Sequence, residues 1–188
     1  MHSEVKRRLV HVSGTVVPLV YAAGLLPWSV VRLLLLLGSA GALGLEALRL
    51  GGVVDWRIFD ELTREYEQDN LAGYALYMFG MTATAWLFAP AVAVPAIMML
   101  TVGDPVSGLL SSGDMGVKAG WVLLAMFGVC LAIASLLAVP LVPAVLGALA
   151  ATLADGAKPI IAGYVIDDNL TIPVGAGAAM AVGLAMLA

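Results

Sequence analysis

The residues from Thr101 to Lys118, TVGDPVSGLLSSGDMGVK, place acidic and basic side chains inside and beside a long apolar run. Asp104 lies several residues within the run, where a carboxylate costs about 2.5–3.5 kcal/mol if the run crosses a membrane. Asp104 and Asp114 have the oxygen atoms that a hard cation prefers, and Lys118 could contact phosphate. The alternative is that Asp104 pairs with a residue of another helix and has a structural role only.

A second group of polar residues lies near the start of the chain. Glu4, Arg7 or Arg8, and His11 recur at the spacing of one helix face. This face predicts a phosphate clamp in which Glu4 orients an arginine, with His11 about one turn inside the apolar run. The alternative is a basic anchor at the lipid head groups, an interpretation that suits Lys6 better.

The third group is the loop 51–70, GGVVDWRIFDELTREYEQDN, which alternates apolar and charged residues at roughly helical spacing. This pattern predicts an amphipathic helix on the cytoplasmic membrane surface. The residues expected to face the membrane are Val54, Ile58, Phe59 and Leu62. Such a helix could also guide a lipid alcohol toward a site, and Arg64 is the candidate for phosphate binding in this loop.

The fourth group consists of Asp155, Lys158, Asp167, Asp168 and Asn169. Asp155 and Lys158 are three residues apart at a predicted helix end, where they could form a local ion pair. A capping role explains Asn169 or Thr171, at the start of the last apolar run. Capping does not explain two adjacent aspartates, and these two could share a metal ion with Asp104.

Composition limits the class of protein. Hydrophobic residues make up 62% of the 188-residue chain and charged residues only 12%, whereas average soluble chains are about 25% charged. The one cysteine, Cys130, excludes a disulfide framework and a cysteine-ligated metal site. Thirteen acidic residues outnumber nine basic ones, so there is no basic surface to make nucleic acid a partner.

The apolar runs predict an all-α fold, because each run has about the 20 residues that a membrane-spanning helix needs. About seven such helices are expected, at residues 8–26, 29–50, 71–89, 91–112, 119–138, 141–162 and 170–188. The expected architecture is a polytopic integral membrane bundle that forms a single domain over residues 1–188.

The polar residues are concentrated at one end of the predicted helices. Every basic residue except Arg32 lies at or beside this end, so the positive-inside rule places it and the N-terminus in the cytoplasm. Asp69-Asn70 and Asp168-Asn169 are predicted to cap the third and seventh helices here. Helix N-termini favour anions. An active site for a magnesium–nucleotide complex is therefore expected on the cytoplasmic side of the cell membrane.

Taken together, the four groups make the chain resemble the polyprenol kinase family, which includes dolichol kinase, phytol kinase and CTP-dependent diacylglycerol kinase. The resemblance covers nearly the whole chain through EVKRRLVHVSG, LTREYEQDNLAGYALY, GDPVSGLLSSGDMGVK and ADGAKPIIAGYVIDDNLTIPV. Its most specific parts are the in-membrane Gly-Asp pair and DDNLTIP. The chain departs from the family after Lys118, where members usually have a Glu-Gly-Ser type segment. Its short length and acidic balance resemble an archaeal member.

The resemblance implies a kinase that uses CTP to phosphorylate a long-chain isoprenoid alcohol, of the dolichol or polyprenol type, at the cytoplasmic membrane face. It also implies that Asp104, Lys118, Asp155, Asp168 and Asn169 match motif positions of the family.

A mechanism follows as an expectation. Asp104, with Asp168 or Asp155, would hold Mg²⁺ against the nucleotide's phosphates. Asp155 or Asp167 would accept the proton of the alcohol. The residues expected to contact nucleotide or phosphate, or to orient those that do, are Glu4, Arg8, His11, Arg64, Lys118, Lys158 and Asn169.

Two other functions compete with this one. A cytidylyltransferase that makes a CDP-activated lipid would use the same CTP, Mg²⁺ and lipid. A non-enzymatic membrane carrier is disfavoured, because carriers place polar groups through the full membrane thickness and have internal repeats. The sequence leaves open which alcohol is used, whether ATP replaces CTP, and whether the protein forms a homodimer.

Overall fold

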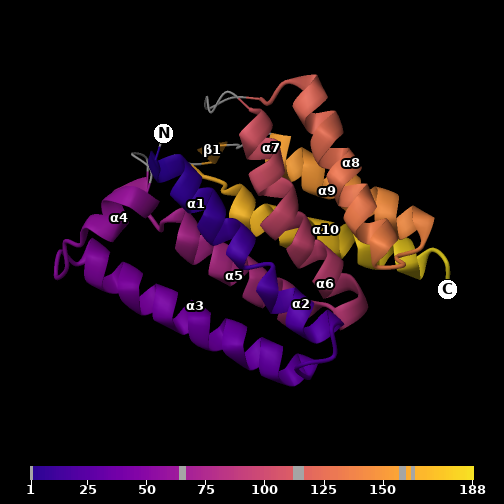
Figure 1. The fold of residues 1–188 in the computed structure, drawn as a ribbon, viewed down its shortest axis with the longest axis horizontal. Coiled ribbons are helices and arrows are strands. Elements are labelled where there is room, and N and C mark those ends of the chain that lie inside the picture. Colours follow the sequence, from indigo (N-terminus) through magenta and orange to yellow (C-terminus); the bar gives the residue numbers. More distant parts are fainter. Residues whose placement is uncertain (1, 64–66, 112–116, 157–159, 162–163) are drawn as a thin grey trace.

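The computed structural model describes residues 2–63, 67–111, 117–156, 160–161 and 164–188, and almost all of this part is helical (Figure 1). The helices are α1 (His2–Ser13), α2 (Val16–Ala22), α3 (Trp28–Leu50), α4 (Arg57–Leu62), α5 (Gly73–Leu87), α6 (Pro90–Met98), α7 (Asp104–Leu110), α8 (Gly120–Leu136), α9 (Leu141–Gly156) and α10 (Asp168–Ala185). The prediction of an all-α architecture is confirmed at this level.

A short hairpin between α9 and α10 is the exception. Strands β1 (Ile160–Ile161) and β2 (Tyr164–Val165) pair antiparallel, with Ile160 opposite Val165. The predicted helix 141–162 is therefore too long, since α9 ends at Gly156. The Gly156 carbonyl accepts a hydrogen bond from the Lys118 backbone N–H at 3.1 Å, so this end of α9 is tied to the segment that leads into α8.

Helix α10 is at the centre of the bundle. It packs against α9, α5 and α6, while α8 covers the other side of α9 and α3 packs along α5 (Figure 1). The core between these helices contains many alanines beside larger apolar residues. The alanines with no exposed surface include Ala93, Ala96, Ala148, Ala151 and Ala176. At the crossing of α5 and α10, a Cβ on Gly80 would collide with the carbonyl oxygen of Asn169.

The first predicted helix, 8–26, is divided into two, and this corrects the expectation of one continuous span. Helix α1 ends at Ser13 and α2 begins at Val16. The His11 carbonyl accepts hydrogen bonds from the Gly14 N–H at 3.1 Å and from the Tyr77 hydroxyl at 2.7 Å. This carbonyl is therefore engaged by a side chain of α5, and the helix does not continue through it.

The predicted helix 91–112 is continuous from Pro90 to Leu110, but it contains a π-helical turn, η2 (Met99–Gly103), directly before Asp104. Pro105 explains the turn. It has no N–H to donate to the carbonyl of Thr101, and in an α-helix its ring would clash with that carbonyl. A π-turn widens the helix at this point. Such turns are rare and are frequent at functional sites.

Two helices in the described part are long and apolar enough to cross a membrane, namely Trp28–Leu50 and Pro90–Leu110. The seven predicted ranges each contain helical structure, but the other helices are shorter or less apolar. Helix α3 also has a long exposed apolar face. Its exposed leucines are Leu33, Leu34, Leu36, Leu37, Leu43, Leu45, Leu48 and Leu50. An apolar surface of this extent is typical of a face that contacts lipid or another protein.

The N-terminal caps differ from those predicted. Helix α5 begins at Gly73, after the predicted cap Asp69-Asn70, and the N–H of Ala72 donates to the carboxylate of Glu46 at 2.9 Å. A buried carboxylate from α3 thus takes over the capping role. At α10 the capping residue is Asp167, whose Oδ1 accepts a hydrogen bond from the Asn169 N–H at 3.0 Å.

Helix α4 lies within the segment 51–70 and packs against the bundle through Phe59. The Phe59 ring stacks on Trp56 at 5.8 Å between ring centroids and lies 6.5 Å from the Tyr74 ring. Phe59 is therefore buried in the protein, which corrects its assignment to the membrane-facing side. Ile58 is exposed, and the side chain of Leu62 is outside the described residues.

Candidate metal and phosphate site

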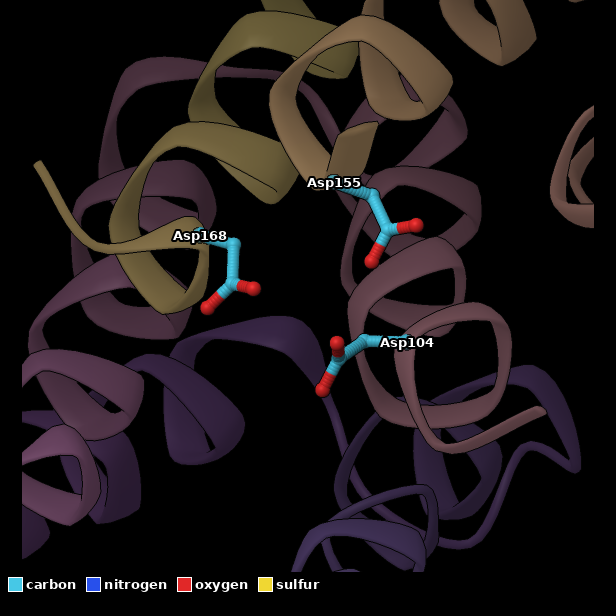
Figure 2. Close-up of side chains that lie close together, drawn as sticks. All are labelled: Asp104, Asp155 and Asp168. Carbon is cyan, nitrogen blue, oxygen red and sulfur yellow. The ribbon is translucent and has the colours of Figure 1, made fainter. Parts of the chain in front are cut away.

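Three aspartates from distant parts of the sequence converge at one place. Asp104 begins α7, Asp155 lies in the last turn of α9, and Asp168 begins α10. One carboxylate oxygen of each lies within 4.8 Å of the other two. Figure 2 shows the three side chains directed toward a common space between the helices. Asp155 and Asp168 are buried and Asp104 is half-buried. The structure thus brings together Asp104, Asp155 and Asp168, whereas Asp167, also considered as a metal ligand, is not a member of this group.

The donor atoms at this place suit a hard divalent cation. Carboxylates this close repel one another unless a positive charge lies among them, and Mg²⁺ prefers oxygen ligands. Asn169 adds a second observation, because its side-chain oxygen is buried and has no hydrogen-bond partner among the described residues. Buried polar atoms are normally satisfied, so a bound group near Asp168 and Asn169 would complete this site.

The partners of Asp155 are a lysine and a serine. Lys118 Nζ lies 2.6 Å from Asp155 Oδ1, and the Ser107 hydroxyl donates to Asp155 Oδ2 at 2.6 Å. Lys118 Nζ also donates to the Ser107 hydroxyl at 3.1 Å. Lys118, a predicted phosphate ligand, is therefore paired with a carboxylate of the cluster. Ser107 was not identified from the sequence, although its i+3 spacing from Asp104 places both on one face of α7.

His11 connects α1 to the cluster. Its Nδ1 lies 3.0 Å from Asp104 Oδ2, and its ring is tilted against the Tyr77 ring at 4.3 Å between centroids. The hydroxyls of Thr15 and Thr101 lie 3.0 Å apart, one turn further along. These contacts fix the N-terminal helix against the π-turn that precedes Asp104. His11, which the sequence predicts as a phosphate-binding residue, thus lies in direct contact with Asp104.

Arg8 lies on the surface of α7 one turn beyond Asp104. A Cβ on Gly108 would come within 3.3 Å of the Arg8 guanidinium carbon. The Arg8 guanidinium therefore lies against Gly108, where α7 has no side chain. This position brings a second basic residue of α1, after His11, to the helix that begins with Asp104.

Asn169, in the first turn of α10, has its side chain near the start of α5 and near the buried carboxylate of Glu67. A Cβ on Gly73 would lie 3.1 Å from Asn169 Nδ2 and 3.4 Å from Glu67 Oε1. Glu67 is buried, with 3% of its surface exposed. The sequence does not predict Glu67 as a site residue, because a glutamate in a polar loop has no distinguishing spacing.

Three of the predicted site residues lie outside the described residues. These are Arg64, Lys158 and, as a side chain, Glu4, whose backbone belongs to α1. The same holds for Asp114.

The structure also contains a buried cluster of Glu46, Arg49 and Tyr74 that is not among the sequence predictions. Glu46 of α3 is 1% exposed. Its carboxylate accepts hydrogen bonds from Nε and Nη2 of Arg49 and from the Tyr74 hydroxyl. Arg49 also donates to the carbonyls of Gln68 and Asn70 at 2.9 and 2.6 Å. A glutamate inside an apolar run has an insertion cost similar to that of Asp104. The position of Glu46 in the sequence is therefore a signal of the same kind. Here the partners are structural and join α3 to the start of α5.

No protein-family model, curated protein or solved structure matches this chain.

Proposed function

We propose that this protein is a Mg²⁺-dependent kinase that transfers phosphate from CTP to the hydroxyl of a long-chain isoprenoid alcohol of the dolichol or polyprenol type. The observation that carries the proposal is the convergence of Asp104, Asp155 and Asp168 within 4.8 Å, with Lys118 and His11 in contact with them. Phosphoryl transfer depends mainly on positioning and on neutralising charge. The choice of nucleotide and acceptor comes from the resemblance to polyprenol kinases.

Under this proposal the side chains bind the metal ion, contact phosphate or supply positive charge beside the cluster. Asp104, Asp155 and Asp168 hold the Mg²⁺ ion, which when bound neutralises charge on the nucleotide's phosphates. Arg8 and His11 on α1 contact phosphate oxygens from one side. Asn169, at the N-terminus of α10, contacts them from the other, where free backbone N–H groups favour an anion. Lys118 adds positive charge beside the cluster and holds one of its carboxylates.

The alcohol also needs a proton acceptor. Asp155 accepts hydrogen bonds at both oxygens from Lys118 and Ser107, an arrangement that favours a fixed ligand over a group that takes up a proton. We therefore assign the proton acceptor to Asp167, which lies next to Asp168 and is buried. An Asp167→Asn variant would then bind Mg²⁺ and lose turnover.

We further propose that the protein is a polytopic protein of the cell membrane with about seven spans and with its site on the cytoplasmic side. Two helices of sufficient length and apolar character and the exposed leucine face of α3 support membrane insertion. The positive-inside pattern of the sequence supports the orientation. The acceptor alcohol would reach the site from the inner leaflet.

The test is an assay of the purified protein in detergent with Mg²⁺, γ-labelled CTP or ATP, and a panel of isoprenoid alcohols. The proposal predicts label in the lipid fraction and release of CDP. Release of pyrophosphate, when a phosphorylated lipid and CTP are supplied, would instead identify a cytidylyltransferase. Absence of both products with every nucleotide and lipid would overturn the proposed chemistry.

A further inference from the structure

Three side chains from three elements form a closed ring beside the carboxylate cluster. Ser107 of α7 donates to Asp155 Oδ2 at 2.6 Å, Lys118 Nζ contacts Asp155 Oδ1 at 2.6 Å, and the same Nζ donates to Ser107 Oγ at 3.1 Å. Ser107 and Asp155 are buried, with 0% and 1% of their surface exposed. Each member of the ring therefore contacts the other two, and only Lys118 is partly exposed, with 14% of its side-chain surface accessible.

The direction of each hydrogen bond follows from the chemistry of the groups. An ammonium group has only donors, whereas a hydroxyl has one proton and two lone pairs. Ser107 therefore accepts from Lys118 and gives its single proton to Asp155. Both oxygens of Asp155 accept hydrogen bonds from fixed donors, so its carboxylate plane cannot rotate without breaking one of them.

Ser107 differs in this respect from several described hydroxyls in helices, although Ser39 and Thr82 also bond across to a neighbouring helix. Thr84, Thr152 and Ser135 each donate to the backbone carbonyl four residues earlier, at 2.7–2.8 Å. This is the usual way in which a hydroxyl in an apolar helix is satisfied. Ser107 has a carbonyl four residues earlier as well, yet its proton goes to a carboxylate of another helix. A purely local role does not explain this choice.

The ring also connects α7 and α9, two of the three helices that supply the cluster. Ser107 lies three residues after Asp104 on α7, so the helix that supplies one carboxylate also holds a second. Lys118 leads into α8, and its backbone N–H donates to the carbonyl of Gly156, next to Asp155, at 3.1 Å. A change at Ser107 would therefore alter the relative placement of Asp104 and Asp155.

We propose that Ser107 is a positioning residue of the site: its hydroxyl, held by Lys118, sets the orientation in which Asp155 offers an oxygen to the divalent cation. The inference rests on the proposed function for the presence of that cation. It assigns to Lys118 a task at Asp155 in addition to any contact with phosphate. Partners that orient a metal ligand typically change metal affinity by about 10–100-fold when removed.

The test compares Ser107→Ala with the matched variant Ser111→Ala. Ser111 lies one turn further along, at the end of α7, and its hydroxyl donates to the carbonyl of Gly108 at 3.2 Å. Purified proteins without nucleotide are titrated with Mg²⁺ while the melting temperature is followed, and with Mn²⁺ by electron paramagnetic resonance. We expect Ser107→Ala to bind both ions about 10–100-fold more weakly than the wild type, and Ser111→Ala to bind them as the wild type does.

A second variant keeps the test decisive if Ser107→Ala does not fold. Ser107→Cys has nearly the same shape but a weak S–H donor, and it should also lose cation affinity. Wild-type affinity in a folded Ser107→Ala or Ser107→Cys protein would overturn the positioning role while leaving the metal site intact. A wild-type protein that binds neither ion would overturn the metal site of the proposed function, and the positioning role with it.

Discussion

Lys118 and Asp155 form a buried ion pair whose two members belong to different elements of the fold. The side chain of Asp155 has no exposed surface and that of Lys118 is 14% exposed. Removing one partner of a buried pair leaves the other charge without compensation, and this usually costs about 3–5 kcal/mol. The pair is therefore expected to matter for stability as well as for the site.

Lys118→Ala should accordingly lower the free energy of unfolding by about 3 kcal/mol, because the Asp155 carboxylate loses the lysine ammonium group that compensates its charge. Lys6→Ala, at an exposed residue, should change it by less than about 0.5 kcal/mol. Thermal unfolding in detergent measures both. Equal melting temperatures for the two variants would show that Asp155 does not depend on Lys118.

At this scale the sequence predicts the acidic side chains of the cluster, and also Lys118 and His11, but not which of these residues pair with one another. Asp104 and Asp155 stand out because a carboxylate inside or at the end of an apolar run is costly. Ser107 does not stand out, because serines in apolar helices usually bond to their own backbone. The contact between His11 and Asp104 likewise depends on how α1 packs on α7, which no local pattern specifies.

Among the elements, the π-turn before α7 has the clearest consequence for the site. Pro105 prevents the regular hydrogen bond to the carbonyl of Thr101, and η2 ends directly before Asp104. A regular α-helix through this segment would present Asp104 in a different direction. The proline and the aspartate therefore act together, although only the aspartate could contact a ligand.

Pro105→Ala should allow a regular helix and so rotate Asp104 away from Asp155 and Asp168. We expect an unchanged or higher melting temperature together with Mg²⁺ affinity reduced by about tenfold or more, as when ligand placement is disturbed. Pro95→Ala, a proline inside α6, is the control and should leave the affinity unchanged. Wild-type Mg²⁺ affinity in Pro105→Ala would contradict a role for the turn.

The contact of α5 with α10 depends on Gly80. An alanine there would place its Cβ against the Asn169 carbonyl oxygen, which cannot move independently of α10. We expect Gly80→Ala to lower the free energy of unfolding by about 1–3 kcal/mol, as overpacking does. Gly175→Ala on α10 meets nothing within 4 Å and should raise it by up to about 1 kcal/mol. Thermal unfolding distinguishes the two, and a stable Gly80→Ala protein would contradict this packing.

For the whole molecule, the lengths of the apolar runs predict where the helices occur, and the structure has helices in all seven ranges. The break after α1 and the start of α5 are not predicted, because they depend on contacts between distant segments. The Tyr77 hydroxyl bonds to the His11 carbonyl at the break after α1, and the Glu46 carboxylate takes the cap of α5. Whether each helix crosses a membrane is a separate question, since within the described residues only two helices have the length and apolar character that this requires.

The proposed topology can be tested with single cysteines in a Cys130→Ser background. Val117, 80% exposed, would lie on the cytoplasmic side, and Ala89, exposed between α5 and α6, on the outside. A membrane-impermeant maleimide should label Ala89→Cys in intact cells and label Val117→Cys only after permeabilisation. The reverse pattern, or equal labelling of both in intact cells, would exclude this orientation.

The central claim is that the three aspartates form one metal site that serves phosphoryl transfer, and the most direct test is transfer of label from γ-labelled CTP to polyprenol. Wild type and Asp104→Asn are compared across a Mg²⁺ titration, with folding checked by melting temperature. The account predicts Mg²⁺-dependent labelled lipid with the wild type and none with a folded Asp104→Asn protein. Undiminished transfer by Asp104→Asn, or transfer by the wild type without divalent cations, would contradict it.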